Sequence, residues 1–224
     1  MAEESLATYR GNCHCAAFVY TVKLPEIKEY TQCNCSICHK KGYSWVFPGS
    51  PEFVHGSLDQ LTAYTFNDGH FKHLFCPTCG TPLLSELSQI PGDKRLGFNI
   101  RAVQNVDVWK LKAKPWDGKA LPGSYRAPIY KGPEPSPEIE DGHTYHGSCH
   151  CGAVTMAVKS SNSACRNAAD EKLETLSDHH KAWWKRVQAR RNITLRCLNN
   201  FDCSNLNTRK LDGWSLVDPI YENP

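Results

Sequence analysis

The sequence lacks a long apolar run and an excess of charge of one sign. No stretch of its 224 residues approaches the roughly 18 apolar residues that a membrane span needs, and the opening MAEESLATYR holds no apolar stretch behind a basic region. Lysine and arginine number 26 against 23 acidic residues, a net charge of +3. This charge is too slight to indicate a nucleic acid or an anionic membrane as partner. We therefore expect a protein of the cytoplasm or nucleus.

The chain is rich in cysteine instead. In a reducing compartment such thiols are metal ligands more often than disulfides, and C-x-C neighbours are awkward to bridge to each other. Seven of the twelve cysteines lie in three short motifs, namely GNCHCAAFVY with Cys13 and Cys15, QCNCSICHKKG with Cys33, Cys35 and Cys38, and FCPTCGTPL with Cys76 and Cys79. This spacing predicts metal binding, and thiolate donors favour zinc.

Two of the motifs are pairs, and each pair can hold two corners of a tetrahedral zinc site. We expect Cys13 and Cys15 to lie in an extended strand, where side chains two apart point to the same face and His14 points away. The segment from Cys76 to Gly80 is similar to a zinc knuckle, in which a tight turn joins both sulfurs and the glycine is left-handed. Together the pairs can close one four-thiolate site, which has no vacancy and is structural.

The triplet Cys33, Cys35 and Cys38 leaves one position of a zinc ion open. Three thiolates leave the site with a formal charge of −1, and a water or thiol at the fourth position would lose its proton more readily. Such a site can activate a nucleophile. A histidine would close the site instead if it supplied the fourth ligand, and the candidates are His39, His55 and His73.

Two features beside the triplet have two interpretations each. Lys40 and Lys41 either offset the negative charge of the thiolates and guide an anionic substrate, or they are solvated surface lysines. Trp45 and Phe47 either wall a pocket or, as alternating aromatic residues on a strand more often do, belong to the core.

The chain also contains an interrupted repeat. Residues 9–23 (YRGNCHCAAFVYTVK) recur as 145–159 (YHGSCHCGAVTMAVK), and 101–121 recur in weaker form at 196–216, including an Asp-Gly turn. The first pair of segments is offset by 136 positions and the second by 95, a difference of 41 residues. The missing residues come from the middle of the second copy, where the first copy carries the triplet and the knuckle.

A proline-rich segment separates the two copies. RAPIYKGPEPSPEIEDG holds four prolines and several acidic residues, a composition typical of an extended linker. We predict a zinc-binding domain over 9–125, a linker over 126–142 with the boundary near Glu138, and a truncated second copy over 143–224.

The second copy keeps only part of the cysteine set. Cys149 and Cys151 repeat the first pair, but Cys197 and Cys203 align with no ligand of the first copy, and Cys165 lies in unrelated sequence. We therefore expect a degenerate, metal-free remnant. Its new middle has apolar residues at spacings of three, four and seven, which predicts a helix near 167–191. A solvated face explains the basic end of this helix better than a nucleic-acid contact.

Secondary structure in the first copy is expected to be mainly β. Runs rich in aromatic and β-branched residues, separated by turn signals, predict strands at 18–23, 43–47, 61–66 and 98–103. No long amphipathic helix is expected there.

Taken in order, these motifs resemble the glutathione-dependent formaldehyde-activating enzyme family, also called the centromere protein V family. The resemblance covers about residues 9–121, from the G-x-C-x-C opening through the triplet and knuckle to the tail NIRAVQNVDVWKL and its Asp-Gly turn. It implies a mainly β fold known as the β-tent, with two zinc ions per chain. The implied ligands are Cys13, Cys15, Cys76 and Cys79 for a structural zinc, and Cys33, Cys35 and Cys38 for an exchangeable one.

The resemblance also implies carbon–sulfur lyase activity on a small thiol and an aldehyde. Glutathione, the co-substrate, and formaldehyde would give S-hydroxymethylglutathione, with the thiol held as a thiolate at the fourth zinc position while it attacks the aldehyde carbon. His39 stands where members of the family often carry a basic residue. The alternative is a non-catalytic, zinc-stabilised interaction module, which a fourth side-chain ligand at the triplet would favour.

Overall fold

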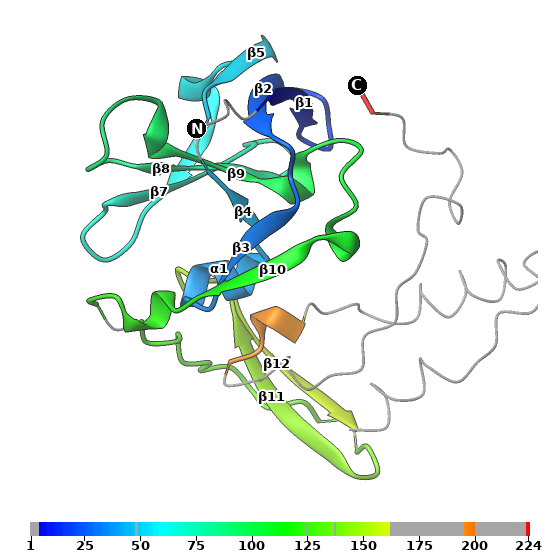
Figure 1. Cartoon of the computed structure of the whole chain (residues 1–224). Helices are drawn as coiled ribbons and strands as arrows, with labels where there is room; N and C mark the ends of the chain where they lie inside the picture. Colours follow the sequence, from blue (N-terminus) through cyan, green and yellow to red (C-terminus); the bar gives the residue numbers. More distant parts are fainter. Residues whose placement is uncertain (1–4, 48, 124, 137, 162–194, 200–222) are drawn as a thin grey trace, which may run out of the picture. The chain divides into compact units, whose positions relative to one another are not determined.

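The computed structural model describes residues 5–47, 49–123, 125–136, 138–161, 195–199 and 223–224 (Figure 1). The chain divides into two compact units, Met1–Ser124 with Gly213–Pro224 and Tyr125–Asp212. The expected mainly β class is confirmed, and the described residues contain one α-helix, α1 (Ser36–Lys41). None of the helices in these ranges has the length and apolarity of a membrane span.

Two sheets build the first unit (Figure 1). The smaller has the order β1-β2-β5 and the larger the order β10-β3-β4-β9-β8-β7-β6. All neighbouring strands are antiparallel except β10 and β3, which are parallel. The strands are β1 (Leu6–Asn12), β2 (Val19–Pro25), β3 (Glu29–Cys33), β4 (Trp45–Val46), β5 (Pro51–His55), β6 (Thr62–Tyr64), β7 (Phe71–Phe75), β8 (Pro82–Leu87), β9 (Leu96–Asn99) and β10 (Lys112–Trp116).

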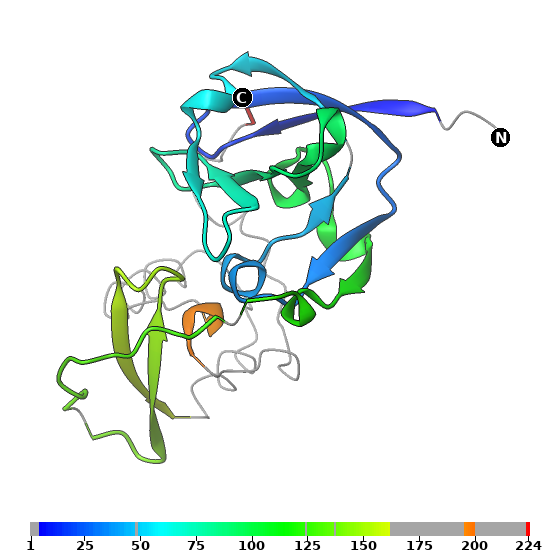
Figure 2. The same cartoon turned by 90° about the vertical axis from the view of Figure 1, so that its left-hand side faces the viewer.

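Five short 3₁₀ turns connect strands of the described first unit. These turns are η1 (Leu58–Gln60), η2 (Gly92–Arg95), η3 (Ile100–Ala102), η4 (Val108–Lys110) and η5 (Gly118–Ala120). Figure 2 shows the same unit with α1 seen end-on.

The apolar core of the first unit contains residues of both sheets. Tyr20, Val22 and Leu24 alternate along β2, as one face of a strand requires, and they share a buried cluster with Leu84 and Phe98 of the larger sheet. The rings of Tyr20 and Phe98 lie 5.8 Å apart. Burying each large apolar side chain contributes about 1.5–3 kcal/mol, so this cluster holds the two sheets together.

The predicted strands are largely confirmed. Strands occur within or across the predicted runs 18–23, 43–47 and 61–66, and α1 is the short exception to an otherwise helix-poor unit. The run 98–103 is only partly a strand, because β9 ends at Asn99. The Asn99 side chain accepts a hydrogen bond from the Arg101 amide at 3.4 Å, which caps the 3₁₀ turn that follows.

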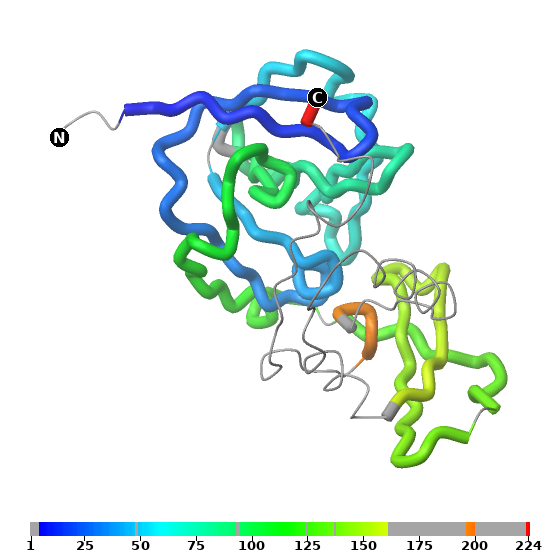
Figure 3. Tube along the Cα trace, turned by 90° about the vertical axis from the view of Figure 1, so that its right-hand side faces the viewer, coloured from blue at the N-terminus to red at the C-terminus, as the bar shows by residue number. Residues whose placement is uncertain are grey.

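The described part of the second unit contains one antiparallel hairpin and one short 3₁₀ turn (Figure 3). These elements are β11 (Gly142–Ser148), β12 (Thr155–Ser161) and η6 (Leu195–Cys197). The helix predicted near 167–191, together with Cys165 and Cys203, lies outside the described residues.

Candidate metal centres

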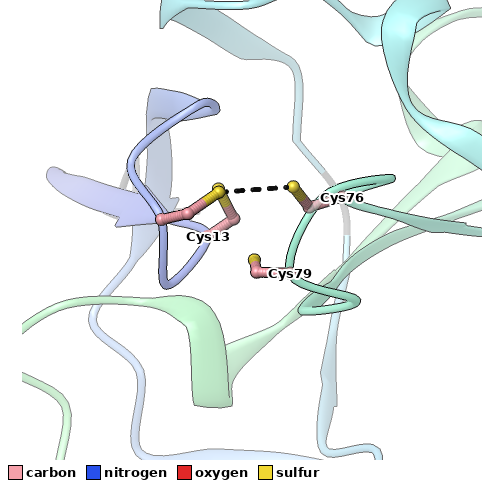
Figure 4. Close-up of side chains that lie close together, drawn as sticks. Cys13, Cys76 and Cys79 are labelled. Carbon is pink, nitrogen blue, oxygen red and sulfur yellow. Dashed lines mark hydrogen bonds between the residues drawn. The ribbon is translucent and has the colours of Figure 1, made fainter.

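Four thiols meet between two turns of the first unit (Figure 4). Cys13 and Cys15 follow β1, Cys76 and Cys79 connect β7 to β8, and all four sulfurs lie within 4.8 Å of one another. The Sγ atoms of Cys13 and Cys15 are 3.6 Å apart, and those of Cys15 and Cys76 are 3.7 Å apart. Zn–S bonds of about 2.3 Å at tetrahedral angles separate two sulfurs by about 3.8 Å. This four-thiol cluster therefore fits zinc.

The expectation that Cys13 and Cys15 lie in an extended strand is wrong. Strand β1 ends at Asn12, and the Ala16 amide donates to the Cys13 carbonyl at 3.1 Å, so residues 13–16 form a tight turn. Ala16 takes the left-handed conformation, with φ of 61°. The turn, and not strand alternation, brings the two sulfurs together, and the Phe18 amide donates to the Cys13 sulfur at 3.3 Å.

The knuckle has the conformation that the sequence predicts. Gly80 is left-handed, with φ of 70°, and its amide donates to the Cys76 carbonyl at 2.9 Å. Thr81 links the two turns, because its hydroxyl lies 3.1 Å from the Cys79 sulfur and also accepts a hydrogen bond from the His14 amide at 3.1 Å. Sequence reasoning did not single out Thr81.

Burial and hydrogen bonding shift the pKa values of Cys13 and Cys79 in opposite directions. Burial raises the pKa of Cys13 to about 12. Burial also raises the pKa of Cys79, but hydrogen bonds from the Thr81 hydroxyl and from backbone amides outweigh it and lower this pKa to about 6. Zinc ligands must be deprotonated, so a buried thiol such as Cys13 ionises at neutral pH only when a cation replaces its proton.

The triplet forms a second cluster, with its three sulfurs within 4.8 Å of one another. Cys33 ends β3, Cys35 precedes the first residue of α1, and Cys38 lies one turn later. The His39 amide donates to the Cys35 carbonyl at 2.9 Å, and this helical turn places residues three apart on one face.

None of the three candidate histidines joins this three-thiol cluster. His39, His55 and His73 all belong to the described part of the chain, where the cluster contains only the three cysteines. The described residues thus offer three protein ligands at this position.

Hydrogen bonds to sulfur divide the protons unequally within the triplet. The thiols of Cys35 and Cys38 lower the pKa of Cys33 to about 3, and the amides of Cys35 and Gly118 act in the same direction. Conversely, Cys33 raises the pKa of Cys35 more than Cys38 lowers it, and Cys33 and Cys35 both raise the pKa of Cys38. Without a cation the cluster therefore carries its charge on Cys33, and a metal must displace the protons of the other two thiols.

A loop from the end of the domain closes over the triplet. Strand β10 runs parallel to β3 and pairs Trp116 with Cys33. Asn34 fixes the residues that follow, because its side chain donates to the Asp117 carboxylate at 2.8 Å and accepts from the Lys119 amide at 2.9 Å. A Cβ atom on Gly118 would overlap with the Cys33 sulfur. The repeated Asp-Gly turn was the sequence signal for this loop, but its role at the triplet was missed.

Aromatic side chains pack against the triplet. Trp45 is buried, donates from Nε1 to the Cys38 sulfur at 3.3 Å and stacks on Tyr43 with ring centroids 4.3 Å apart, whereas Phe47 is 44% exposed. Trp45 is thus both a core residue and a neighbour of the site. The Tyr43 hydroxyl is buried and has no hydrogen-bond partner among the described residues.

Lys41 is not a fully solvated surface lysine. Its Nζ lies 4.3 Å from the centroid of the Phe75 ring, which directly precedes the knuckle, and burial lowers its pKa. The ammonium group therefore lies on α1 where this helix approaches the strand that leads to the four-thiol cluster.

Residues 8–116 match the family described as glutathione-dependent formaldehyde-activating enzyme. Over these residues, which we call the family domain, the chain is similar to this family. Both cysteine clusters lie inside the family domain, whereas Asp117 and Gly118 lie just beyond the matched residues. The family match points to a glutathione- and formaldehyde-related function for these residues. A crystal structure of a Rhodobacter sphaeroides protein is also similar, with 28% identity over 48% of this chain and 98% of that chain and a TM-score of 0.41.

Proposed function

We propose that the family domain is a zinc-dependent carbon–sulfur lyase that acts on thiol–aldehyde adducts. The reaction joins glutathione and formaldehyde to S-hydroxymethylglutathione, or runs on a closely related pair, and is reversible. The observation that supports this proposal is the difference between the two clusters. The first cluster offers four thiols, and the triplet offers three. Among the described residues, no further histidine, cysteine or carboxylate belongs to the triplet cluster.

We assign a structural zinc to Cys13, Cys15, Cys76 and Cys79 and a second zinc to the triplet, two ions per chain. Four thiolates leave no position for a substrate, and the ion then joins the β1–β2 turn to the β7–β8 turn. Zinc at the triplet would supply an open position for a thiol and lower the pKa of that thiol.

The proposed reaction forms one bond between the glutathione sulfur and the aldehyde carbon. The π electrons of the carbonyl move to its oxygen, which takes up a proton and becomes the hydroxyl of the adduct. In the reverse direction the hydroxyl loses this proton, the carbonyl reforms and the carbon–sulfur bond breaks to release the thiolate. The protein must therefore orient the thiol and provide a proton donor near the aldehyde oxygen.

Tyr43 is the described side chain that best fits the donor role. Burial raises the pKa of its hydroxyl, and electrostatic interaction with Cys38 and Cys35 raises it further. The phenol consequently stays protonated at neutral pH and can donate a hydrogen bond. Its ring is fixed by stacking on Trp45 and on His73, which avoids reorganisation during the reaction.

Lys41 fits a role in attracting the co-substrate. Glutathione carries two carboxylates and one ammonium group at neutral pH, and the triplet with one zinc is also anionic. A half-buried ammonium on the same helix as Cys38 offsets the repulsion between them. This position favours the substrate-guiding interpretation of Lys41 over that of a solvated lysine.

Titration of the zinc-loaded protein with millimolar glutathione tests the proposal. We expect X-ray absorption at the zinc edge to show that one zinc environment gains sulfur and the other stays unchanged. Adding formaldehyde should then give S-hydroxymethylglutathione faster than the uncatalysed reaction, as followed by NMR. Cys35→Ser should lose one zinc and the activity while keeping its fold. If glutathione changes neither zinc environment and the adduct forms no faster than in the uncatalysed reaction, the domain is an interaction module.

A further inference from the structure

The second unit carries a cysteine pair for which the proposed lyase has no use. Cys149 and Cys151 lie at the end of β11 with their sulfurs 3.6 Å apart, the same separation as between Cys13 and Cys15. The ten described cysteines form no disulfide. Cys151 is exposed and Cys149 is half-buried, so the pair is open to solvent.

The backbone holds this second pair as it holds the first. The Cys149 amide donates to the Val154 carbonyl at 2.9 Å, and the Val154 amide donates to the Cys149 sulfur at 3.2 Å. The corresponding distances at Cys13 and Phe18 are 3.0 and 3.3 Å. Amides that point at a sulfur stabilise a thiolate more than a thiol.

The backbone contacts that each hairpin makes with a later segment of the chain also match. Gly147 bridges to Leu198 as Gly11 bridges to Val103. The backbone amide of Asn199 donates to the His146 carbonyl at 2.7 Å, and the backbone amide of Gln104 donates to the Arg10 carbonyl at 2.8 Å. The second pair is thus built to the same pattern as a half of the four-thiol cluster, and it is not a chance approach of two surface cysteines.

The geometry fits two corners of a tetrahedral ion. Sulfurs on such a zinc lie about 3.8 Å apart, whereas a linear two-coordinate ion with the same bonds would hold them about 4.6 Å apart. In the first unit the other two corners come from the knuckle. No third metal ligand joins Cys149 and Cys151 among the described residues.

We propose that Cys149 and Cys151 form half of an intermolecular zinc site, which the same pair of a second copy of this chain completes. A two-fold axis through the ion places two identical cysteine pairs opposite each other, and together they supply the four thiolates that a closed zinc site requires. The exposure of the pair allows this approach. Zinc then controls the association of two chains at a position that the lyase proposal does not involve.

The test measures zinc content and molar mass of the intact chain in the presence of a thiol-free reductant, which removes any disulfide-linked dimer. With zinc alone as the probe, we expect a dimer by sedimentation that holds one additional zinc for every two chains compared with Cys149→Ser. Cys149→Ser and the exposed-site variant Cys151→Ser should both stay monomeric. Cys197→Ser is the matched control, because Cys197 belongs to the same unit but lies outside the pair, and it should dimerise normally.

Three results would overturn the intermolecular site. The first is a monomer at every zinc concentration, and the second is a monomer that binds a further zinc within one chain. The third is a dimer that survives both substitutions at the pair. Cobalt substitution adds a spectroscopic check, since dimer formation should increase the ligand-field absorption of tetrahedral cobalt thiolate. Lyase activity of Cys149→Ser is read separately, so failure of the lyase proposal leaves this test intact.

Discussion

At the residue scale, Tyr43 and Tyr20 provide a matched comparison within the family domain. Both hydroxyls are buried and have no hydrogen-bond partner among the described residues. Tyr43 stacks on Trp45 beside the triplet, whereas Tyr20 packs against Phe98 between the two sheets. Burying an unpaired hydroxyl costs about 1–3 kcal/mol. The two tyrosines carry the same cost, and only Tyr43 lies beside the triplet, so a comparison of the two separates stability from a role in the proposed reaction.

We predict that Tyr43→Phe stabilises the domain and impairs the enzyme. Removing the unpaired hydroxyl should raise the free energy of unfolding by about 1 kcal/mol, and losing the hydrogen-bond donor should lower the lyase rate about 10²-fold. Zinc content should not change. Tyr20→Phe should give a similar gain in stability with normal activity. Denaturant unfolding and adduct formation measure the two effects, and a fully active Tyr43→Phe would remove Tyr43 from the mechanism.

A second prediction at the residue scale concerns Gly118, which lies against the Cys33 sulfur. Gly118→Ala should push the Cys33 sulfur away, because the new methyl group overlaps with it. Residues that support metal ligands typically contribute 10-fold to 100-fold to affinity, so we expect zinc at the triplet to bind about 10–100-fold more weakly. The four-thiol cluster should keep its ion. Competition with a chelator measures both sites, and Lys119→Ala, an exposed change in the same turn, is the control. Equal affinities in both variants would contradict this role.

At the element scale, the two clusters differ in what they connect. The four-thiol cluster joins the β1–β2 turn of one sheet to the β7–β8 turn of the other, whereas the triplet spans only the end of β3 and the start of α1. A structural zinc contributes about 10–16 kcal/mol of binding free energy, which matches or exceeds the 5–15 kcal/mol stability of a typical domain. Loss of the two ions should therefore have different structural consequences.

We predict that Cys76→Ser abolishes cooperative thermal unfolding and that Cys35→Ser preserves it. The first change removes a ligand that links the sheets, and the second removes one from a local loop. Circular dichroism during heating, together with zinc content, distinguishes the two variants. A cooperative transition in Cys76→Ser with no zinc bound at that cluster would show that apolar packing alone holds the sheets together.

The sequence predicted those features of the site that depend on local spacing. The knuckle followed from a glycine placed directly after Cys79, and the three-thiol cluster followed from three cysteines within six residues. The Cys13 pair was predicted with the wrong backbone, since a turn and a strand can both bring i and i+2 sulfurs together. The position of Gly118 depends on pairing between β3 and β10, which are some 80 residues apart, and that of Tyr43 depends on stacking against His73 of β7. No local pattern encodes either contact.

At the scale of the whole molecule, the family domain should work without the second unit. We predict that a chain ending at Glu138 keeps two zinc ions and full lyase activity, because all seven thiols precede that point. It should lose about 1–3 kcal/mol of stability, since Arg10 and Gln104 no longer donate to the Pro224 carbonyl at 2.9 and 3.1 Å. Elemental analysis and unfolding of both chains test this. Loss of a family-domain zinc on truncation would refute the ligand assignment.

The parallel pairing of β10 with β3 has a consequence for the order in which the protein matures. All ligands of the four-thiol cluster precede β10 in the chain and leave the ribosome before it does, so that ion can bind while synthesis continues. The triplet is translated even earlier, but Cys33 is not fixed until β10 and Gly118 arrive. Because domains generally fold during synthesis from the N-terminal end, the structural ion should be loaded first. The reactive centre would then become competent only when its own domain is complete.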